Sequence, residues 1–249
     1  MTESGGTIAL VTGAASGIGA AVADRLSRAG TTVIGADLHE AGVRNTAAAV
    51  MLDVRDESSW IRVVNGIVST HGRLDLLVNC VGVAAGSPLA ETTIEEWRKV
   101  LSTNLDGAFL GTKHGIRTMK VTGGAIIHIG SASGIRAAAG AAAYSASKAG
   151  LAMMVRAAAK ECRDGGLGIR INLVSPAGVK TPMWSSMPFF QDLVRRLGSE
   201  DAAYASMAET GGGRFIEPDA VAQAVCFLAG PGAEHITGVE LPVDAGYIL

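Results

Sequence analysis

Cysteine is scarce in this chain of 249 residues, and its three cysteines form no recognisable pattern. Cys80, Cys162 and Cys226 are odd in number, lie far apart and include no Cys-x-x-Cys pair. Disulfide scaffolds use even sets of cysteines, and zinc sites use closely spaced ones. The sequence therefore argues against both, and we expect reduced, partly buried thiols.

An excess of charge of one sign is also lacking. The chain has 21 lysines and arginines against 23 acidic residues, and its basic residues do not cluster. Nucleic acids and anionic membranes attract proteins through clustered basic residues. We therefore expect neither a nucleic-acid nor a membrane partner. The five histidines show no metal-ligand spacing, and no metal is expected.

Long hydrophobic runs are absent as well. No stretch approaches the roughly 18 apolar residues of a membrane span, and residues 1–6 lack the basic and apolar regions of a signal peptide. We expect a cytoplasmic protein. Because 48% of the residues are hydrophobic and no linker is evident, residues 1–249 are predicted to form a single domain.

What the chain does contain is an alternation of short β-rich runs with longer helical patterns, which is typical of βαβ units. The runs are nearly continuously apolar, so both faces of the sheet should be covered. We expect strands at 7–12, 31–36, 48–52, 74–78, 125–129, 169–174 and 238–243, and helices at 17–29, 56–71, 93–119, 142–164 and 217–229. The predicted fold is α/β: a single-domain Rossmann fold with a doubly wound, seven-stranded parallel sheet.

Residues 180–214 break this alternation and concentrate aromatic side chains in a chain with only 4% of them. Long irregular insertions in compact domains are often functional. We interpret this segment as a mobile lid over a substrate; an ordinary pair of helices packed over the core is the alternative.

A glycine-rich loop, Thr12 to Gly19, joins the first strand to the first helix. A tight turn and a close approach of pyrophosphate to bare backbone both require glycine, and the helix N-terminus attracts the anion. We expect a dinucleotide to contact the loop at Gly13, Ser16, Gly17, Ile18 and Gly19. The spacing, Gly-x-x-x-Gly-x-Gly, differs from the Gly-x-Gly-x-x-Gly fingerprint.

Polar residues follow three other predicted strands, at the sheet edge where ligands bind in open α/β folds. Asp37 ends the second strand and could accept hydrogen bonds from the adenosine ribose, which favours NAD because a 2′-phosphate would be repelled. It could also be only a turn residue. Asp53 with Val54, and Asn79 with Val81, are further cofactor candidates, although Asp53 and Asn79 could instead cap the helices that follow.

Tyr144 and Lys148 lie four residues apart in a predicted helix and so project from one face. A neighbouring cation favours phenolate and so makes tyrosine a stronger acid. Ser131 ends a predicted strand thirteen residues upstream, where its hydroxyl could join that of Tyr144 on one substrate oxygen.

Taken together, these motifs resemble the short-chain dehydrogenase/reductase family over essentially the whole chain. The resemblance implies that Tyr144 is the general acid/base, Ser131 polarises the substrate oxygen, and Lys148 binds the nicotinamide ribose and lowers the pKa of Tyr144. Asn104 would bend its helix and hold a water in a proton relay. Further residues follow from the resemblance or from their place in the chain: Pro176, Val179 and Thr181 for the cofactor, and Ser133, Met183, Trp184 and Met187 for the substrate.

Three departures from the family pattern stand out, and the last of them, Asp244-Ala245-Gly246 with alanine in place of the usual second glycine, is a small change. The usual Asn-Asn-Ala-Gly after the fourth strand is Asn79-Cys80-Val81-Gly82 here, and the usual Pro-Gly after the sixth strand is Pro176-Ala177-Gly178. We expect altered packing beside the cofactor from the first, and the second makes the placement of the nicotinamide less certain.

The sequence thus predicts an NAD-dependent oxidoreductase that interconverts a secondary alcohol and a ketone, with an apolar, cyclic, aromatic or steroid-like substrate. The alternatives are a 3-oxoacyl thioester reductase and, from another class, a non-catalytic dinucleotide-sensing protein. The helix carrying Tyr144 is apolar almost all round, so one face should pack against a second subunit. A homodimer or homotetramer is expected.

Overall fold

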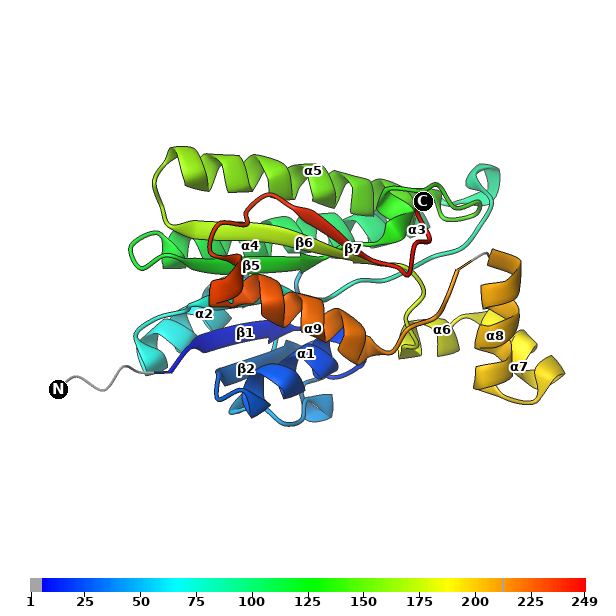
Figure 1. Ribbon diagram of the computed structural model, residues 1–249, viewed down its shortest axis with the longest axis horizontal. Coiled ribbons are helices and arrows are strands. Elements are labelled where there is room, and N and C mark those ends of the chain that lie inside the picture. Colours follow the sequence, from blue (N-terminus) through cyan, green and yellow to red (C-terminus); the bar gives the residue numbers. More distant parts are fainter. Residues whose placement is uncertain (1–5, 212) are drawn as a thin grey trace.

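The computed structural model describes residues 6–211 and 213–249 and contains one seven-stranded parallel sheet (Figure 1). Residues 1–5, part of the stretch in which no signal peptide was expected, lie outside the described residues, as does Gly212 of the predicted lid. The strands are β1 (Ile8–Thr12), β2 (Thr32–Asp37), β3 (Ala48–Met51), β4 (Leu76–Asn79), β5 (Gly124–Ile129), β6 (Ile169–Pro176) and β7 (Glu240–Val243). All seven predicted strands are confirmed, with ends that differ by a few residues.

The strand order is β3-β2-β1-β4-β5-β6-β7. The chain builds outward from β1 to β3, then returns to the other side of β1 and builds outward again. The order therefore reverses between β1 and β4, and the connections leaving their carboxyl ends diverge there. This is the place where open α/β sheets bind their ligands, and the fold class predicted from the sequence is confirmed.

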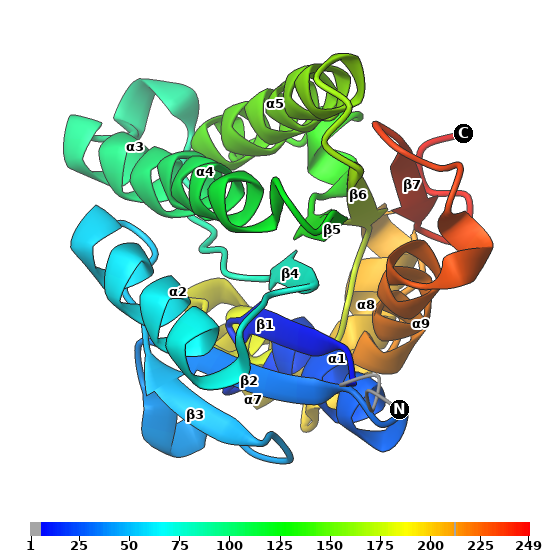
Figure 2. The same ribbon diagram turned by 90° about the vertical axis from the view of Figure 1, so that its left-hand side faces the viewer.

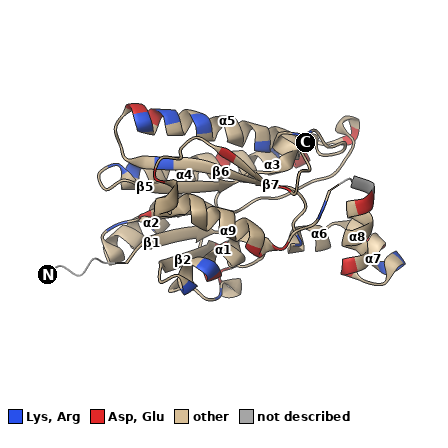
Figure 3. Cartoon of the chain, in the orientation of Figure 1, with Lys and Arg blue, Asp and Glu red and all other residues tan. Residues whose placement is uncertain are grey.

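Helices cover both faces of the sheet (Figure 2). They are α1 (Gly17–Arg28), α2 (Glu57–His71), α3 (Ile94–Leu101), α4 (Gly107–Met119), α5 (Ala142–Asp164), α6 (Pro182–Ser185), α7 (Pro188–Leu197), α8 (Glu200–Gly211) and α9 (Pro218–Ala229). Helices α1 and α9 pack together on one face, and α2, α4 and α5 cover the other. Within the strands only Asp37, Arg170 and Glu240 carry charge (Figure 3), as a sheet buried on both faces requires.

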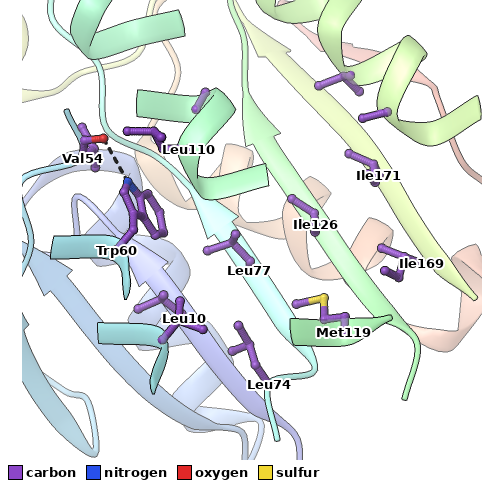
Figure 4. Close-up of a cluster of buried hydrophobic side chains, with 14 of the residues drawn as sticks. Leu10, Val54, Trp60, Leu74, Leu77, Leu110, Met119, Ile126, Ile169 and Ile171 are labelled. Atoms are coloured by element: carbon purple, nitrogen blue, oxygen red, sulfur yellow. Dashed lines mark hydrogen bonds between the residues drawn. The ribbon is translucent and has the colours of Figure 1, made fainter. Parts of the chain in front are cut away.

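The larger core surrounds Trp60, which is fully buried under α4 (Figure 4). Its indole N–H donates to the Val54 carbonyl at 2.9 Å, which satisfies a donor that would be costly to bury alone. A Cβ at Gly111 would lie 2.8 Å from the ring, so α4 can approach only because that residue is glycine. The core thereby fixes the main chain at Val54, beside the predicted cofactor site.

The helix predicted over 93–119 contains an irregularity. It consists of α3, a π-helical turn at Ser102–Asp106, and α4. Such widened turns are frequent at functional sites, and this one contains Asn104, the residue expected to bend the helix.

The segment 180–214 folds into three short helices, α6, α7 and α8, which project beyond the end of the sheet (Figure 1). Pro182 and Pro188 each occupy a first turn, where a missing N–H has no cost. The segment buries its own small core of Phe190, Ala203 and Tyr204, with Trp184 and Phe215 packed against it.

Candidate active site

The glycine-rich loop has the backbone shape that the sequence predicted for it. Gly13 and Gly17 have φ angles of +69° and +55°, a region that side chains disfavour. A Cβ on Gly19 would lie 2.1 Å from the Gly13 carbonyl oxygen, so no other residue fits there. The loop and the first turn of α1 thus leave bare backbone N–H groups for an anion, as a pyrophosphate needs.

Beside the loop, at the carboxyl ends of β1, β2 and β4, lies a cleft of about 740 Å³. Ten of the predicted cofactor residues line it: Gly13, Ser16, Gly17, Ile18, Gly19, Asp37, Asp53, Val54, Val81 and Thr181. Asn79 does not. Its side chain is buried against α4, where a Cβ at Gly111 would lie 2.6 Å from its Oδ1.

Asp37 is held where β2 meets the glycine-rich loop. Its two carboxylate oxygens accept hydrogen bonds from the main-chain N–H groups of Ala15 at 3.1 Å and His39 at 3.0 Å. These bonds stabilise the loop and leave the carboxylate in the cleft lining, with lone pairs for further donors.

Asp53 forms an ion pair with Arg55, whose guanidinium nitrogens donate to both carboxylate oxygens at 2.9 and 2.7 Å. The guanidinium lowers the pKa of the Asp53 carboxyl. Arg55 and Lys99 also line the cleft, and the sequence analysis missed both. The position of Arg55 directly after the Asp53-Val54 pair could have indicated that it lines the cleft. Lys99 lies in α3 and reaches the cleft only through tertiary packing, which no local pattern indicates.

A second cleft, of about 400 Å³, adjoins the first and shares with it Ile18, Cys80, Gly82, Ala84, Thr181 and Met183. The remaining predicted cofactor residues, Tyr144, Lys148, Pro176 and Val179, line this second cleft. So do all six predicted substrate residues: Ser131, Ser133, Tyr144, Met183, Trp184 and Met187. Most of the other lining residues are apolar, and Phe189, Met207, Phe215 and Tyr247 are the largest of those outside the predicted substrate set.

The Ser131 hydroxyl and the Tyr144 phenol both line this second cleft, and the Ser131 hydroxyl lowers the pKa of the phenol. Ser131 follows β5, and the start of α5 places Tyr144 and Lys148 one turn apart. The Ser131 oxygen also accepts from the Ser133 N–H at 3.1 Å, which fixes its orientation. A substrate oxygen in the cleft can therefore meet two hydroxyls at once.

Burial dominates the electrostatics of this group. It raises the pKa of Tyr144, while the hydrogen bond with Ser131 acts in the opposite direction. Burial also lowers the pKa of Lys148 to about 8. In both residues the charged form, phenolate for Tyr144 and ammonium for Lys148, loses hydration on burial. Lys148 Nζ donates to the Ile129 carbonyl at 2.9 Å and lies 5.7 Å from the centre of the Tyr144 ring. Ser131 thus lowers the pKa of Tyr144 in this structure, and the lowering by Lys148 that the resemblance implies stays a prediction.

Asn104 lies in the π-helical turn and is only 1% exposed. Its Oδ1 accepts from the Val83 N–H at 2.8 Å, and its Nδ2 donates to the Val83 carbonyl at 2.9 Å and to Ser147 Oγ at 3.1 Å. Both amide hydrogens are thus occupied by protein. The side chain fastens the loop after β4 to α5, and its part in a proton relay stays a prediction.

The displaced glycine after Pro176 has a steric explanation. A Cβ at Gly178 would lie 3.0 Å from the Phe215 ring, and the Gly178 carbonyl accepts from the Ile216 N–H at 2.9 Å. The segment after α8, at Phe215 and Ile216, therefore packs against residue 178, and only a glycine leaves room for it there.

Comparison with known proteins agrees with this geometry. The family model described as enoyl-(acyl carrier protein) reductase matches residues 13–248. A cis-4-hydroxycyclohexanecarboxylate dehydrogenase from Sinomonas cyclohexanicum is 37% identical over 96% of this chain and 96% of that protein.

Among solved structures, an actinorhodin polyketide ketoreductase variant with NADPH gives a TM-score of 0.87 at 33% identity, covering 100% of this chain and 99% of that one. A 3-ketoacyl-(acyl-carrier-protein) reductase from Brucella melitensis, complexed with NADH, gives 0.82 at 27% identity, with coverages of 98% and 99%. With the glycine-rich loop, the Ser131–Tyr144–Lys148 group and these matches over nearly its whole length, the chain belongs to the short-chain dehydrogenase/reductase family of oxidoreductases.

Proposed function

We propose that this protein interconverts a secondary alcohol and a ketone, with NAD(H) as its preferred coenzyme and an apolar, ring-bearing substrate. The observation that carries the proposal is that Ser131 and Tyr144 line one apolar cleft, which adjoins the dinucleotide cleft. The nicotinamide, when bound, accepts or supplies the hydride.

Residues of the chain exchange a proton with the substrate oxygen. In alcohol oxidation Tyr144, as phenolate, takes the proton of the substrate hydroxyl, and Ser131 hydrogen-bonds the same oxygen. In ketone reduction Tyr144 returns the proton. Burial favours the neutral phenol, so oxidation requires either alkaline pH or a positive charge brought near the phenol.

Coenzyme preference is inferred from Asp37, whose carboxylate lines the cleft at the end of β2. A 2′-phosphate within about 4 Å of it would be repelled by roughly 4 kcal/mol per unit charge at an effective dielectric of 20. Arg55 and Lys99 line the same cleft, but Arg55 is already paired with Asp53. Steady-state kcat/KM with NADH and NADPH tests the preference, and an equal or higher value with NADPH would contradict it.

The reaction itself is tested with a panel of secondary alcohols and ketones, followed by nicotinamide absorbance. The panel should include cyclohexanol, 4-hydroxycyclohexanecarboxylate and a hydroxysteroid. Tyr144→Phe should reduce kcat by at least about 100-fold, the usual scale of general acid/base catalysis, while NADH binding is retained. Near-normal turnover by that variant would contradict the role of Tyr144.

The runner-up is reduction of a 3-oxoacyl thioester, favoured by the carrier-protein reductases among the similar proteins. Acetoacetyl coenzyme A in the same panel discriminates the two. Higher kcat/KM for the thioester than for every cyclic ketone would favour it. The dinucleotide-sensing alternative has less support, because Ser131, Tyr144 and Lys148 are intact and assembled.

We further infer that residues 180–214 form a lid, since Met183, Trp184, Met187, Phe189 and Met207 of this segment line the substrate cleft.

Among the described residues no helix has the length and apolar character of a membrane span, and a cytoplasmic location stays a prediction.

A homodimer or homotetramer is proposed from α5. Ala146, Ala149, Met153 and Ala157 form an exposed apolar stripe on it, and the helix's charged residues gather mainly toward its C-terminal end (Figure 3). Exposed apolar stripes of this kind mark protein interfaces.

A further inference from the structure

The C-terminal turn reaches the substrate cleft, and neither the motifs nor the family resemblance had singled it out as part of that site. Tyr247 lines the cleft together with Ser131 and Tyr144. The turn that presents it is held by Asp244, a buried carboxylate that accepts from the N–H groups of Gly246 at 3.0 Å and Ile248 at 3.1 Å. Ala245 adopts a left-handed φ of 52° there, a costly conformation for alanine that these bonds support.

Arg136 contacts Tyr247 through a hydrogen bond and through its aromatic ring. Its Nη1 donates to the Tyr247 carbonyl at 2.6 Å, and its guanidinium carbon lies 4.6 Å from the centre of the Tyr247 ring. Planar stacking on an aromatic face is a particular strength of arginine. Within residues 6–211 and 213–249, no ion pair found includes Arg136, so Tyr247 is the main object of its contacts.

The Tyr247 ring also meets the segment that follows α8. A Cβ at Gly213 would lie 2.8 Å from Tyr247 Cδ2, so the ring and that segment are in close contact. The ring therefore contacts both Arg136, which follows the Ser131 loop, and Gly213, which follows α8. Arg136 itself does not line the cleft, so its charge is held behind the ring and the wall presented to a substrate is aromatic.

We propose that Tyr247 determines substrate selectivity, by forming a fixed aromatic wall that limits the size of a ring-bearing, uncharged alcohol or ketone, and that Arg136 is a positioning residue acting through Tyr247. The inference rests on the proposed function, since it assumes that the second cleft receives the alcohol. An aromatic ring held in place by such contacts loses little entropy on binding. It discriminates by shape, with one methylene group worth about 10- to 200-fold in a fitted pocket.

Binding to the enzyme–NADH complex tests the wall without requiring turnover. Isothermal titration calorimetry measures Kd for cyclohexanol and for 4-tert-butylcyclohexanol, and the ratio of the two constants is the readout. Tyr247→Ala should shift this ratio toward the bulkier alcohol by about tenfold or more. Tyr247→Phe keeps the ring and should leave the ratio within about threefold of the wild type.

Arg136 is tested by its dependence on Tyr247. Arg136→Ala should shift the ratio in the same direction as Tyr247→Ala but less, and Arg136→Lys should restore it in part. In the Tyr247→Ala background, Arg136→Ala should add nothing, which is the non-additivity expected of residues that act as a unit. NADH affinity should not change in any of these variants.

An unchanged Kd ratio in Tyr247→Ala would show that Tyr247 does not limit substrate size. If Arg136→Ala still shifted the ratio fully in the Tyr247→Ala background, Arg136 would not act through Tyr247. If neither alcohol binds to the wild-type complex, the cleft is not an alcohol site and the inference fails with it. If both alcohols bind with the expected ratios but no alcohol or ketone is turned over, the proposed function fails while the wall stands.

Discussion

The Asn104 side chain and the Val83 main chain form a reciprocal pair of hydrogen bonds, at 2.8 Å to the Val83 N–H and 2.9 Å to its carbonyl. Val83 lies in the loop after β4, which lines the dinucleotide cleft. A third bond, from Asn104 Nδ2 to Ser147 Oγ at 3.1 Å, continues to α5, and Ser147 Oγ in turn donates to the Tyr144 carbonyl at 2.7 Å. The π-helical turn thus connects the loop after β4 to the backbone of Tyr144.

Replacing Asn104 should therefore affect stability and cofactor binding together. Asn104→Ala leaves the Val83 N–H and carbonyl without their partner and should lower the free energy of unfolding by about 2 kcal/mol. It should also raise KM for the coenzyme, because the loop after β4 is no longer fastened. Denaturant unfolding and steady-state kinetics measure the two effects.

Asp106→Asn is the matched control, because Asp106 lies in the same turn but is exposed. It should change neither quantity appreciably. An Asn104→Ala protein with normal coenzyme KM would show that the loop keeps its place without this side chain.

Ser131 should control the pH at which Tyr144 acts. Its hydrogen bond lowers the pKa of the phenol, against burial, which raises it. Ser131→Ala should therefore raise the apparent pKa of Tyr144. Alcohol oxidation needs the phenolate and increases with pH through that pKa, so the rising limb of kcat should move to higher pH.

The measurement is a pH profile of alcohol oxidation at saturating coenzyme. Ser133→Ala serves as the control, since Ser133 gives Ser131 its main-chain N–H, which alanine retains. Its profile should keep the wild-type midpoint. A Ser131→Ala profile at the same or lower pH would rule out the assigned role of this hydrogen bond.

Gly19 and Gly66 offer a paired test of the phosphate-binding loop. A Cβ at Gly19 would lie 2.1 Å from the Gly13 carbonyl oxygen, whereas none of the surrounding atoms comes within 4 Å of a Cβ at Gly66, in the exposed part of α2. Gly19→Ala should force the loop to shift, at a cost of about 1–3 kcal/mol in stability, and weaken NADH binding severely. Gly66→Ala should stabilise the protein by up to about 1 kcal/mol.

Thermal unfolding and NADH fluorescence titration distinguish the two variants. Tight NADH binding by Gly19→Ala would mean that the dinucleotide does not rest on this loop.

These residues also show what the sequence could predict. The glycine-rich loop and Asp37 were found because local chemistry decides them: the turn excludes side chains, and a carboxylate ends a strand. Tyr247 and Lys99 were not, because they enter the clefts through tertiary packing, whereas Arg55 was missed although it directly follows the Asp53-Val54 pair. Asn104 was predictable only in part. The sequence showed that asparagine is unfavourable inside a helix, but it did not show that Val83 is its hydrogen-bond partner.

The displaced Gly178 illustrates the same limit. Its position follows from the Phe215 ring, 3.0 Å from where a Cβ would be, and Phe215 is 37 residues further along the chain. Only the folding of the segment between them brings the two together, so no local pattern could have explained the shift.

The exposed stripe on α5 predicts how the subunits assemble. Met153 is 61% exposed in the middle of this stripe, and Phe109 on α4, the helix that packs beside α5, is 50% exposed. Burying a large apolar side chain contributes about 1.5–3 kcal/mol, so a charge at Met153 should oppose association strongly. Sedimentation should show the wild type as a dimer or tetramer, and Met153→Glu should shift it toward the monomer. Lys160→Gln alters a charge at the polar end of the same helix and should leave assembly intact. A monomeric wild type, or a Met153→Glu protein that assembles normally, would place the subunit contact elsewhere.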